Sequence, residues 1–238
     1  MRHTCRGCSI RSQALCSALP DATLEQINRI SRRRRLAAGR ALFSEDEAAS
    51  MVANVLSGVA KVSVSLPDGR TQVVGLHFAG DFVGRPFAGP VSQLIEAATD
   101  IELCCFERSR FEALLREHKG LEELFVRRIT DELDAARDWM LLLGHKSAEE
   151  RVASLIGHCL DRLEPPRCGL AQERRGPIRI DLPLSRSEMA QYLGMTIETV
   201  SRMLKRLSSD GVIAIEPGRG LRVLDRVELE RRAERIMQ

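Results

Sequence analysis

Residues 185–209 read SRSEMAQYLGMTIETVSRMLKRLSS and contain two helix starts separated by one turn. Ser185 and Glu188 form a capping-box pattern, which is typical of the first turn of a helix. Gly194 begins a short turn, and Thr196 is placed to cap a second helix that runs to about residue 207. Two helices joined by a three-residue turn that contains glycine are the helix-turn-helix pattern. This stretch therefore predicts a unit that binds double-stranded DNA.

The second of these helices presents polar side chains on one face. Val200 and Leu204 supply its apolar inner face at helical spacing. In the major groove, arginine can bind guanine through two hydrogen bonds and glutamate can accept a hydrogen bond from cytosine. The alternative is that Glu198 and Arg202 form only a surface ion pair. We predict DNA contacts from five residues of this helix: Glu198, Thr199, Ser201, Arg202 and Lys205.

The sequence around this motif predicts the rest of a winged helix-turn-helix domain over residues 147–238. Ser147 and Glu150 form another capping box, opening a helix that ends before two prolines, and residues 164–180 are typical of a loop leading into a short strand. Downstream, two apolar runs flank Pro217-Gly218-Arg219-Gly220, which predicts a hairpin. Arg219 at its tip is predicted to contact DNA phosphate, a role that does not depend on base sequence.

Residues 36–108 predict an all-β structure. Valines alternate with small or polar residues from Val55 to Val64, and Pro67-Asp68-Gly69 is typical of a hairpin turn. Recurring glycines favour the tight corners of a compact antiparallel roll, which we assign to residues 21–120. A preceding helix is predicted to end in Arg32-Arg33-Arg34-Arg35, a basic run that indicates a solvated helix end more than a nucleic-acid patch.

One long helix is predicted over residues 121–146. Ser109 and Glu112 form a capping-box pattern for a shorter helix before it, and from Phe125 to Leu143 apolar residues then recur at helical steps. The stripe is narrow, which favours pairing with an identical helix, although it could instead pack on its own β domain. The predicted homodimer interface comprises Ile129, Leu133, Ala136 and Met140.

The composition is that of a folded protein of two domains. The chain has 238 residues, of which 44% are hydrophobic and 29% charged. It contains no apolar run of membrane-spanning length and no export signal, so we expect a cytoplasmic location. A net charge of +3 permits nucleic-acid binding without requiring it. Since the nucleotide-binding and metalloprotease motifs are missing, we do not expect an enzyme.

Seven cysteines need an explanation, because an odd number without an export signal disfavours a disulfide framework. Three of them lie close together near the N-terminus, and the adjacent pair Cys104 and Cys105 would face opposite sides of a strand. Three close cysteines and one distant one suit an iron-sulfur cluster. A zinc site, in which His3 could replace a thiolate, and a metal-free disulfide switch remain alternatives. Structural or incidental roles are predicted for Cys159 and Cys168.

Several stretches resemble the CRP/FNR family of bacterial transcription regulators, and in particular its oxygen-responsive FnrL/FnrN type, over nearly the whole chain. They are Cys5-x2-Cys8-x7-Cys16, Gly80-Asp81-Phe82-Val83-Gly84, Leu103-Cys104-Cys105-Phe106, Trp139-Met140-Leu141-Leu142-Leu143, Ala148-Glu149-Glu150-Arg151 and Glu198-Thr199-Val200-Ser201-Arg202. The resemblance implies an α+β fold with an N-terminal cyclic-nucleotide-binding-like β-roll, a long dimerisation helix and a C-terminal winged helix-turn-helix domain.

The resemblance also implies a cofactor, a 4Fe-4S cluster bound by Cys5, Cys8, Cys16 and Cys104. In the family, this cluster stabilises the dimer at low oxygen, and Glu198, Ser201 and Arg202 would then read palindromic TTGAT-like sites. RNA polymerase is an implied partner, although Arg85-Pro86-Phe87 differs from the family's contact residues. A cyclic nucleotide is not expected, because residues 90–95 lack the arginine and serine that would hold its phosphate.

The N-terminal segment, residues 1–20, is short and poor in apolar residues. Such a segment would not fold alone, so we expect that the cluster orders it and ties it to Cys104. Loss of the cluster would then release the segment and change the balance of monomer and dimer.

Overall fold

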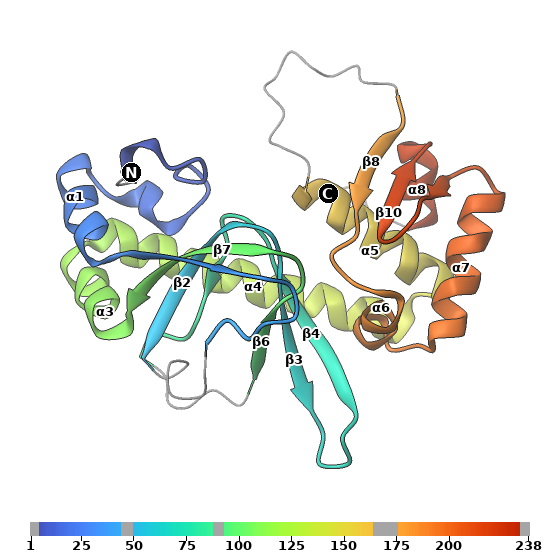
Figure 1. The fold of residues 1–238 in the computed structure, drawn as a ribbon, viewed down its shortest axis with the longest axis horizontal. Helices are drawn as coiled ribbons and strands as arrows, with labels where there is room; N and C mark the ends of the chain where they lie inside the picture. The colour runs from blue at the N-terminus through green and yellow to red at the C-terminus, as the bar shows by residue number, and fades with distance from the viewer. Residues whose placement is uncertain (1–4, 44–49, 88–92, 164–175, 234–238) are drawn as a thin grey trace. The chain divides into compact units, whose positions relative to one another are not determined.

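The computed structural model describes residues 5–43, 50–87, 93–163 and 176–233. The chain divides into two compact units, Met1–Ala136 and Arg137–Gln238, and the division falls inside the 27-residue helix α4 (Lys119–His145). Figure 1 shows an N-terminal unit rich in strands and a C-terminal unit rich in helices. Among the helices of the described ranges, none is long and apolar enough to cross a membrane.

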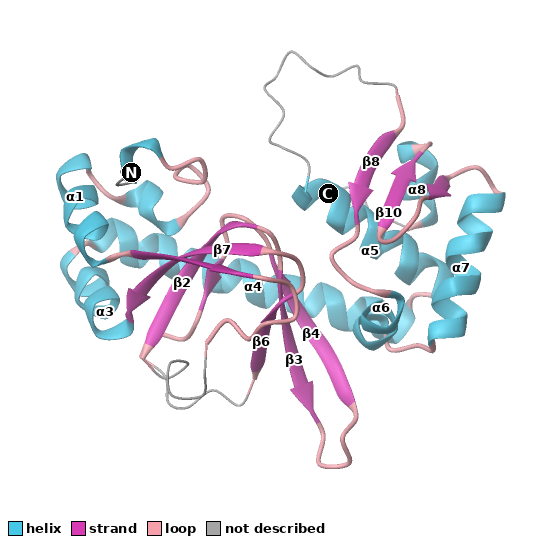
Figure 2. Ribbon diagram, in the orientation of Figure 1, coloured by secondary structure: helices cyan, strands magenta, loops and turns pink. Residues whose placement is uncertain are grey.

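Two antiparallel sheets form the predicted β-roll. One sheet has the strand order β1-β7-β2-β5, and the other has the order β4-β3-β6. The hairpin predicted around Pro67-Asp68-Gly69 is confirmed, since β3 pairs with β4 on either side of this turn and Gly69 has a positive φ of 84° (Figure 2). The strands are β1 (Arg32–Leu36), β2 (Met51–Ser57), β3 (Ala60–Ser65), β4 (Thr71–His77), β5 (Phe82–Val83), β6 (Leu94–Ala97) and β7 (Ile101–Glu107).

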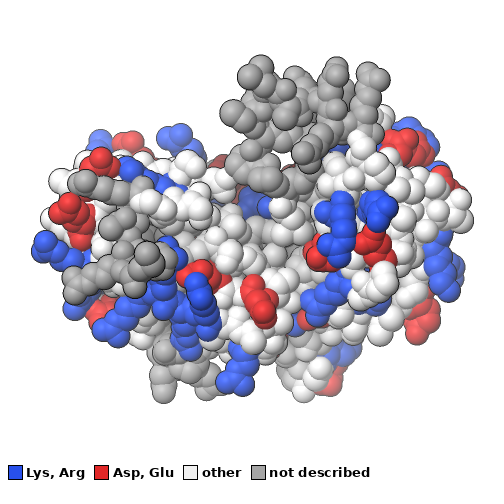
Figure 3. Space-filling view, turned by 45° about the horizontal axis from the view of Figure 1, so that its top comes forward, with Lys and Arg blue, Asp and Glu red and all other residues white. Residues whose placement is uncertain are grey.

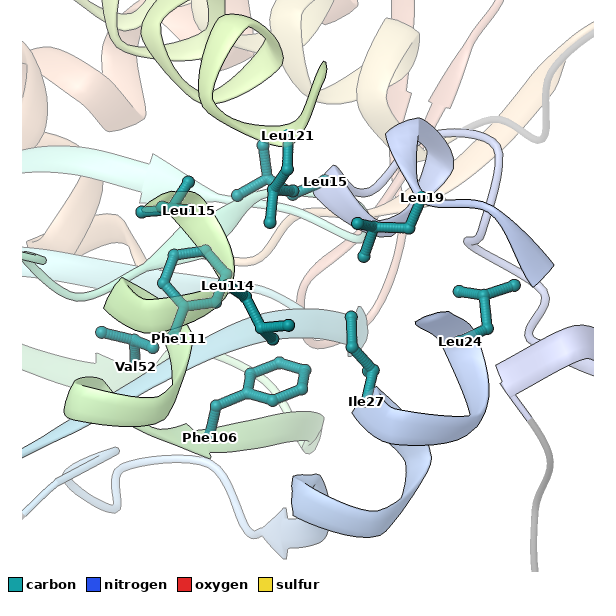
Figure 4. Close-up of a cluster of buried hydrophobic side chains, with 10 residues drawn as sticks. All are labelled: Leu15, Leu19, Leu24, Ile27, Val52, Phe106, Phe111, Leu114, Leu115 and Leu121. Carbon is teal, nitrogen blue, oxygen red and sulfur yellow. The ribbon is translucent and has the colours of Figure 1, made fainter. Parts of the chain in front are cut away.

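Alternation along β2 and β7 gives the four-stranded sheet two different faces. Ala53, Val55, Leu103 and Cys105 contribute to a buried cluster inside the roll, which we call the inner cluster. Val52 and Phe106 point to the other side and join ten buried side chains that we call the outer cluster (Figure 4). Its members are Leu15, Leu19, Leu24, Ile27, Val52, Phe106, Phe111, Leu114, Leu115 and Leu121.

The helices of the N-terminal unit supply the rest of the outer cluster. They are the 3-10 helices η1 (Cys5–Gly7) and η2 (Leu15–Ala18), and the α-helices α1 (Asp21–Ile30), α3 (Arg108–Glu117) and the start of α4. In Figure 1, α1 and α3 lie at the same end of the roll. The N-terminal segment is thus packed on the roll by apolar side chains, with Ile10, Ala14, Leu15 and Leu19 buried. This apolar packing was not predicted from the sequence.

The C-terminal unit has the predicted winged helix-turn-helix fold. A three-stranded sheet of order β8-β10-β9 provides the wing, with β9 and β10 on either side of the predicted turn. Residues 164–175 of the predicted loop at 164–180, which include Cys168, lie outside the described residues. The elements are α5 (Ala148–Leu163), β8 (Ile178–Asp181), α6 (Arg186–Leu193), α7 (Ile197–Ser209), β9 (Ile213–Ile215), β10 (Gly220–Val223) and α8 (Arg226–Arg232).

The capping predictions for the C-terminal unit are confirmed. Ser185 and Glu188 form a complete capping box at the start of α6, and Gly194 ends this helix in the left-handed conformation with φ 61°. The hydroxyl of Thr196 accepts a hydrogen bond from the backbone N–H of Thr199 at the start of α7. These local signals fix where both helices begin and where the turn lies, which positions the exposed face of α7.

Two predictions for the N-terminal unit were wrong. The run Arg32–Arg35 is not a helix end but strand β1, which pairs with β7, because α1 already ends at Ile30 and both Arg33 and Arg35 form ion pairs with Glu102 on β7. The second concerns α3, which begins at Arg108 with no side-chain cap. Glu112 is instead engaged by Arg108 and by the backbone N–H of Phe87, so the capping box does not form.

Candidate functional site

Four of the cysteines lie on one side of the four-stranded sheet. Cys104 on β7 is half-buried and packs against the outer cluster together with Cys5 and Cys16. Cys8 and Cys16 also pack against a small cluster formed by Ile10, Ala14 and Leu56, which Cys104 contacts as well. Cys105 points the other way, is 3% exposed and belongs to the inner cluster. The predicted set of Cys5, Cys8, Cys16 and Cys104 is therefore brought together, and Cys105 is separated from it.

The environment of these thiols favours the protonated form in the metal-free protein. Burial, and to a smaller extent the neighbouring Cys5, raise the pKa of Cys104 to about 12. Burial and the nearby Cys8 raise the pKa of Cys16 to about 11, and the same two causes raise the pKa of Cys5. Since each thiol affects the titration of another, the sulfurs are close enough to interact electrostatically.

Two polar side chains near the end of α1, those of Asn28 and Ser31, contact cysteines of this set. The thiol of Cys5 donates a hydrogen bond of 3.6 Å to the side-chain oxygen of Asn28. Ser31 forms side-chain hydrogen bonds with both Cys5 and Cys104, and these bonds lower the pKa of each thiol. The sequence analysis missed both residues, because their role depends on how α1 packs beside β7.

The cysteines do not converge on a single point. Within the described ranges, no three histidine, cysteine or acidic side chains are arranged to hold one metal ion. A tetrahedral zinc site requires all four sulfurs within about 2.3 Å of the metal. In a cubane iron-sulfur cluster, each thiolate binds a different iron atom, so the four sulfurs surround the cluster and remain apart.

Helix α7 presents the residues predicted to contact DNA. Val200 and Leu204 are buried as predicted, whereas Glu198, Arg202 and Lys205 are exposed and Thr199 and Ser201 are half-buried. Hydrogen bonds from its own backbone N–H and from Thr196 lower the pKa of Glu198, so its carboxylate is charged at neutral pH. Among the described residues, no ion pair joins Glu198 to Arg202. Both side chains thus remain available to bases.

Two other basic residues of this unit are engaged within the fold. Arg219 in the wing donates a hydrogen bond of 2.6 Å to the carbonyl oxygen of Pro183 and lies 3.8 Å from a carboxylate oxygen of Glu188. Arg206 on α7 forms an ion pair of 3.0 Å with Glu149 on α5. In Figure 3, where the C-terminal unit lies to the right, blue and red side chains lie next to each other on it. On this face, acidic side chains therefore interrupt the basic surface of the C-terminal unit.

Helix α4 carries an exposed apolar stripe. The predicted residues Ile129, Leu133 and Met140 are 49%, 48% and 67% exposed, and Ala136 is also exposed. Phe125 differs from the prediction: it is half-buried and makes edge contacts with Phe82 and Phe111 of the same unit. The exposed stripe instead begins at Val126, which is 58% exposed. Large apolar side chains at this spacing are typical of a helix that pairs with another helix.

Comparison with known proteins identifies both units. A Cyclic nucleotide-binding domain model matches residues 33–118, and a Crp-like helix-turn-helix domain model matches residues 150–232. A probable transcriptional activator of Rhizobium leguminosarum bv. viciae is 43% identical over 227 residues, covering 95% of this chain and 92% of the relative. The chain belongs to the CRP/FNR family of transcription regulators.

Other CRP/FNR proteins are also similar over most of this chain. The transcriptional activator protein FnrL of Cereibacter sphaeroides is 40% identical over 223 residues, covering 94% of this chain and 89% of the relative. The solved structure of FixK2 from Bradyrhizobium japonicum matches with a TM-score of 0.73 and 29% identity, covering 85% of this chain and 96% of that one. The predicted family and fold class are confirmed, and the family consists of DNA-binding regulators rather than enzymes.

The CRP/FNR helix-turn-helix is fixed to the end of α4 by contacts within the C-terminal unit. The guanidinium of Arg151 on α5 donates hydrogen bonds to three backbone carbonyls, those of Leu143, Lys146 and Leu193. The rings of Trp139 on α4 and Tyr192 on α6 stack with their centroids 4.1 Å apart. These contacts join the last turns of the long helix to α6, so a displacement of that helix end would be transmitted to α6.

Proposed function

We propose that this CRP/FNR protein is an oxygen-responsive transcriptional activator that binds DNA as a homodimer when it holds a 4Fe-4S cluster. The observation that carries the proposal is the position of Cys104, on the sheet face where Cys5, Cys8 and Cys16 also lie. Four thiolates of which three are close in sequence form a usual ligand set for this cluster. When bound, the cluster supplies a reaction with oxygen that breaks it down and removes the link between these cysteines.

The chain's own residues would connect this site to DNA binding. The segment that carries Cys5, Cys8 and Cys16 packs through Leu15 and Leu19 on Leu121 of α4 (Figure 4). The same helix continues into the apolar stripe, which a second copy of the chain would cover. A dimer places two α7 helices on one duplex, so the preferred site would be a palindrome of TTGAT-like half-sites read by Glu198, Ser201 and Arg202.

Two alternatives use the same cysteines. A zinc site is less well supported, because the described thiols do not surround one point. A metal-free disulfide switch is less well supported, because reactive cysteines need a lowered pKa whereas burial raises the pKa of both Cys16 and Cys104.

Activation would require a contact with RNA polymerase. A short exposed segment of the roll supplies one surface for it: Phe87 is 55% exposed, has a positive φ of 58°, and lies under the guanidinium of Arg116. Its backbone N–H donates a hydrogen bond to Glu112, which holds the ring in this position. A cyclic nucleotide is not part of the proposal, and residues 90–92, half of the stretch on which that expectation rests, lie outside the described ranges.

The decisive experiment is purification without oxygen, followed by exposure to air. We expect a brown protein with about four iron atoms and four sulfides per chain, which loses its colour in air. Fluorescence anisotropy with a palindromic duplex should show tight binding before exposure and weak binding after it. A protein that contains zinc instead of iron, or that binds the duplex equally well in both states, would contradict the proposal.

A further inference from the structure

A buried asparagine lies beside the proposed fourth ligand. Asn54 on β2 is 3% exposed, although it is polar and sits in the middle of a central strand. Among the described residues, its side-chain oxygen has no hydrogen-bond partner. Leaving a buried polar atom without a partner destabilises the folded protein, so the position calls for an explanation.

The register of the sheet places this side chain on the cysteine face. Asn54 is the direct cross-strand partner of Cys104 on β7 and of Phe82 on β5. Directly paired residues of antiparallel strands point to the same face, with their Cβ atoms about 4.5 to 5.5 Å apart. Along β2, the neighbours of Asn54 on that face are Val52 in the outer cluster and Leu56, which packs against Cys8 and Cys16. Its amide is thus enclosed on the face of the four-stranded sheet where the four cysteines lie.

A cluster would require hydrogen-bond donors at this place. Thiolate and sulfide sulfurs carry negative charge and can only accept, and in a buried site that charge is costly without donors. A side-chain amide has an oxygen at one end and two N–H donors at the other, and rotation about its last torsion exchanges them. The Asn54 side chain can therefore place an N–H group where its oxygen now has no partner, and this N–H group can face a sulfur.

We propose that the Asn54 amide donates a hydrogen bond to a sulfur at Cys104 and thereby stabilises the cluster. This inference rests on the function proposed above and adds a positioning residue that is not itself a ligand. Outer partners of metal ligands contribute about 10-fold to 100-fold to metal retention, and hydrogen bonds to sulfur raise the reduction potential of a cluster.

The test compares Asn54→Leu with the wild-type protein, both prepared without oxygen. The leucine has a similar size but no donor, so we expect bleaching in air to become about tenfold faster and the reduction potential to become more negative. Asn54→Thr keeps an O–H donor, so its bleaching rate and reduction potential should lie between those of the wild-type protein and Asn54→Leu. Ser63→Ala is the matched control, because Ser63 is a buried polar residue (4% exposed) on β3 of the other sheet and should leave both quantities unchanged.

Thermal unfolding of the cluster-free proteins separates this role from a purely structural one. Removing an unpaired polar atom should leave the melting temperature of Asn54→Leu unchanged or higher. If Asn54→Leu does not fold, Asn54→Asp serves instead, since it keeps the shape, lacks the donor and should lose iron faster. If Asn54→Leu or Asn54→Asp bleaches at the wild-type rate and has the wild-type reduction potential, the inference is overturned. A wild-type protein without iron and sulfide would overturn the proposed function itself.

Discussion

Arg128 on α4 donates a hydrogen bond of 2.5 Å from its guanidinium to the backbone carbonyl of Gln13. Gln13 lies between Cys8 and Cys16, and Arg128 immediately precedes Ile129 of the exposed stripe. This hydrogen bond adds to the packing of Leu15 and Leu19 on Leu121, and it connects the cysteine-bearing segment to the part of α4 that is proposed to pair with a second copy.

Replacing Arg128 should uncouple the two sites. In Arg128→Leu, we expect normal iron and sulfide content but about tenfold weaker binding to the palindromic duplex, because a hydrogen bond to a charged group contributes roughly 1.5 to 3 kcal/mol. Fluorescence anisotropy without oxygen measures the affinity. Arg127→Leu removes an exposed neighbouring charge and serves as the control. Equal affinities of the two variants would show that the Gln13 contact carries no coupling.

Arg202 should determine one position of the DNA site. Arg202→Ala is expected to lose about 1 to 3 kcal/mol of discrimination at a single base pair, because it removes a bidentate contact with guanine. Binding to the palindrome and to its single-base variants measures this loss. Arg206→Ala should leave base preference unchanged, because Arg206 is paired with Glu149. If Arg202→Ala keeps the wild-type base preference, Arg202 does not read the base sequence.

Leu133 should be necessary for dimer formation. Leu133→Asp places a charge in the centre of the exposed stripe of α4, so we expect monomers by size-exclusion chromatography even without oxygen. Leu66→Asp is a matched control, since Leu66 in the N-terminal unit is 49% exposed and Leu133 is 48% exposed. Persistence of a dimer in Leu133→Asp would place the interface elsewhere.

The two adjacent cysteines should respond differently to replacement. Cys104→Ala should abolish iron binding, whereas Cys105→Ala should retain the iron and lose only about 1 kcal/mol of stability from the smaller side chain in the inner cluster. Iron analysis and thermal unfolding measure the two effects. Similar iron content in both variants would refute the assignment of Cys104.

The metal-free thiols should react only at high pH. The folded pKa values of Cys16 and Cys104, about 11 and about 12, exceed the ordinary thiol value of 9.0. Folding therefore favours the protonated form, so the contribution of these two thiols to the free energy of unfolding should be constant below about pH 9 and fall as the pH rises toward 12. Alkylation followed by mass spectrometry should label both cysteines slowly at pH 7 and quickly after denaturation. Rapid labelling of the folded protein at pH 7 would instead favour a thiol switch.

The features that could be predicted from the sequence are those with local causes. The caps at Ser185 and Thr196, the turn at Gly194 and the hairpin at Gly69 depend on neighbouring residues, and all four are found in the structure. The strand character of Arg32–Arg35 could not be predicted, because it depends on pairing with β7, which lies far away in the sequence.

Only part of the candidate site could be predicted from the sequence. Strand alternation alone shows that Cys104 and Cys105 face opposite sides, but only the resemblance indicated which one faces the N-terminal cysteines. The roles of Asn28, Ser31 and Asn54 depend on how α1, β2 and β7 are placed, so no pattern in the sequence marks them.

Strand β1 lies at the edge of its sheet, and four consecutive arginines occupy it. An edge strand exposes unpaired backbone groups that can add a strand from another molecule, which is a common route to aggregation. Glu102 compensates part of this charge through Arg33 and Arg35, but two copies of β1 side by side would still bring eight arginines together. The basic run thus disfavours association of copies through this sheet edge, whereas the exposed stripe of α4 carries apolar side chains that favour it.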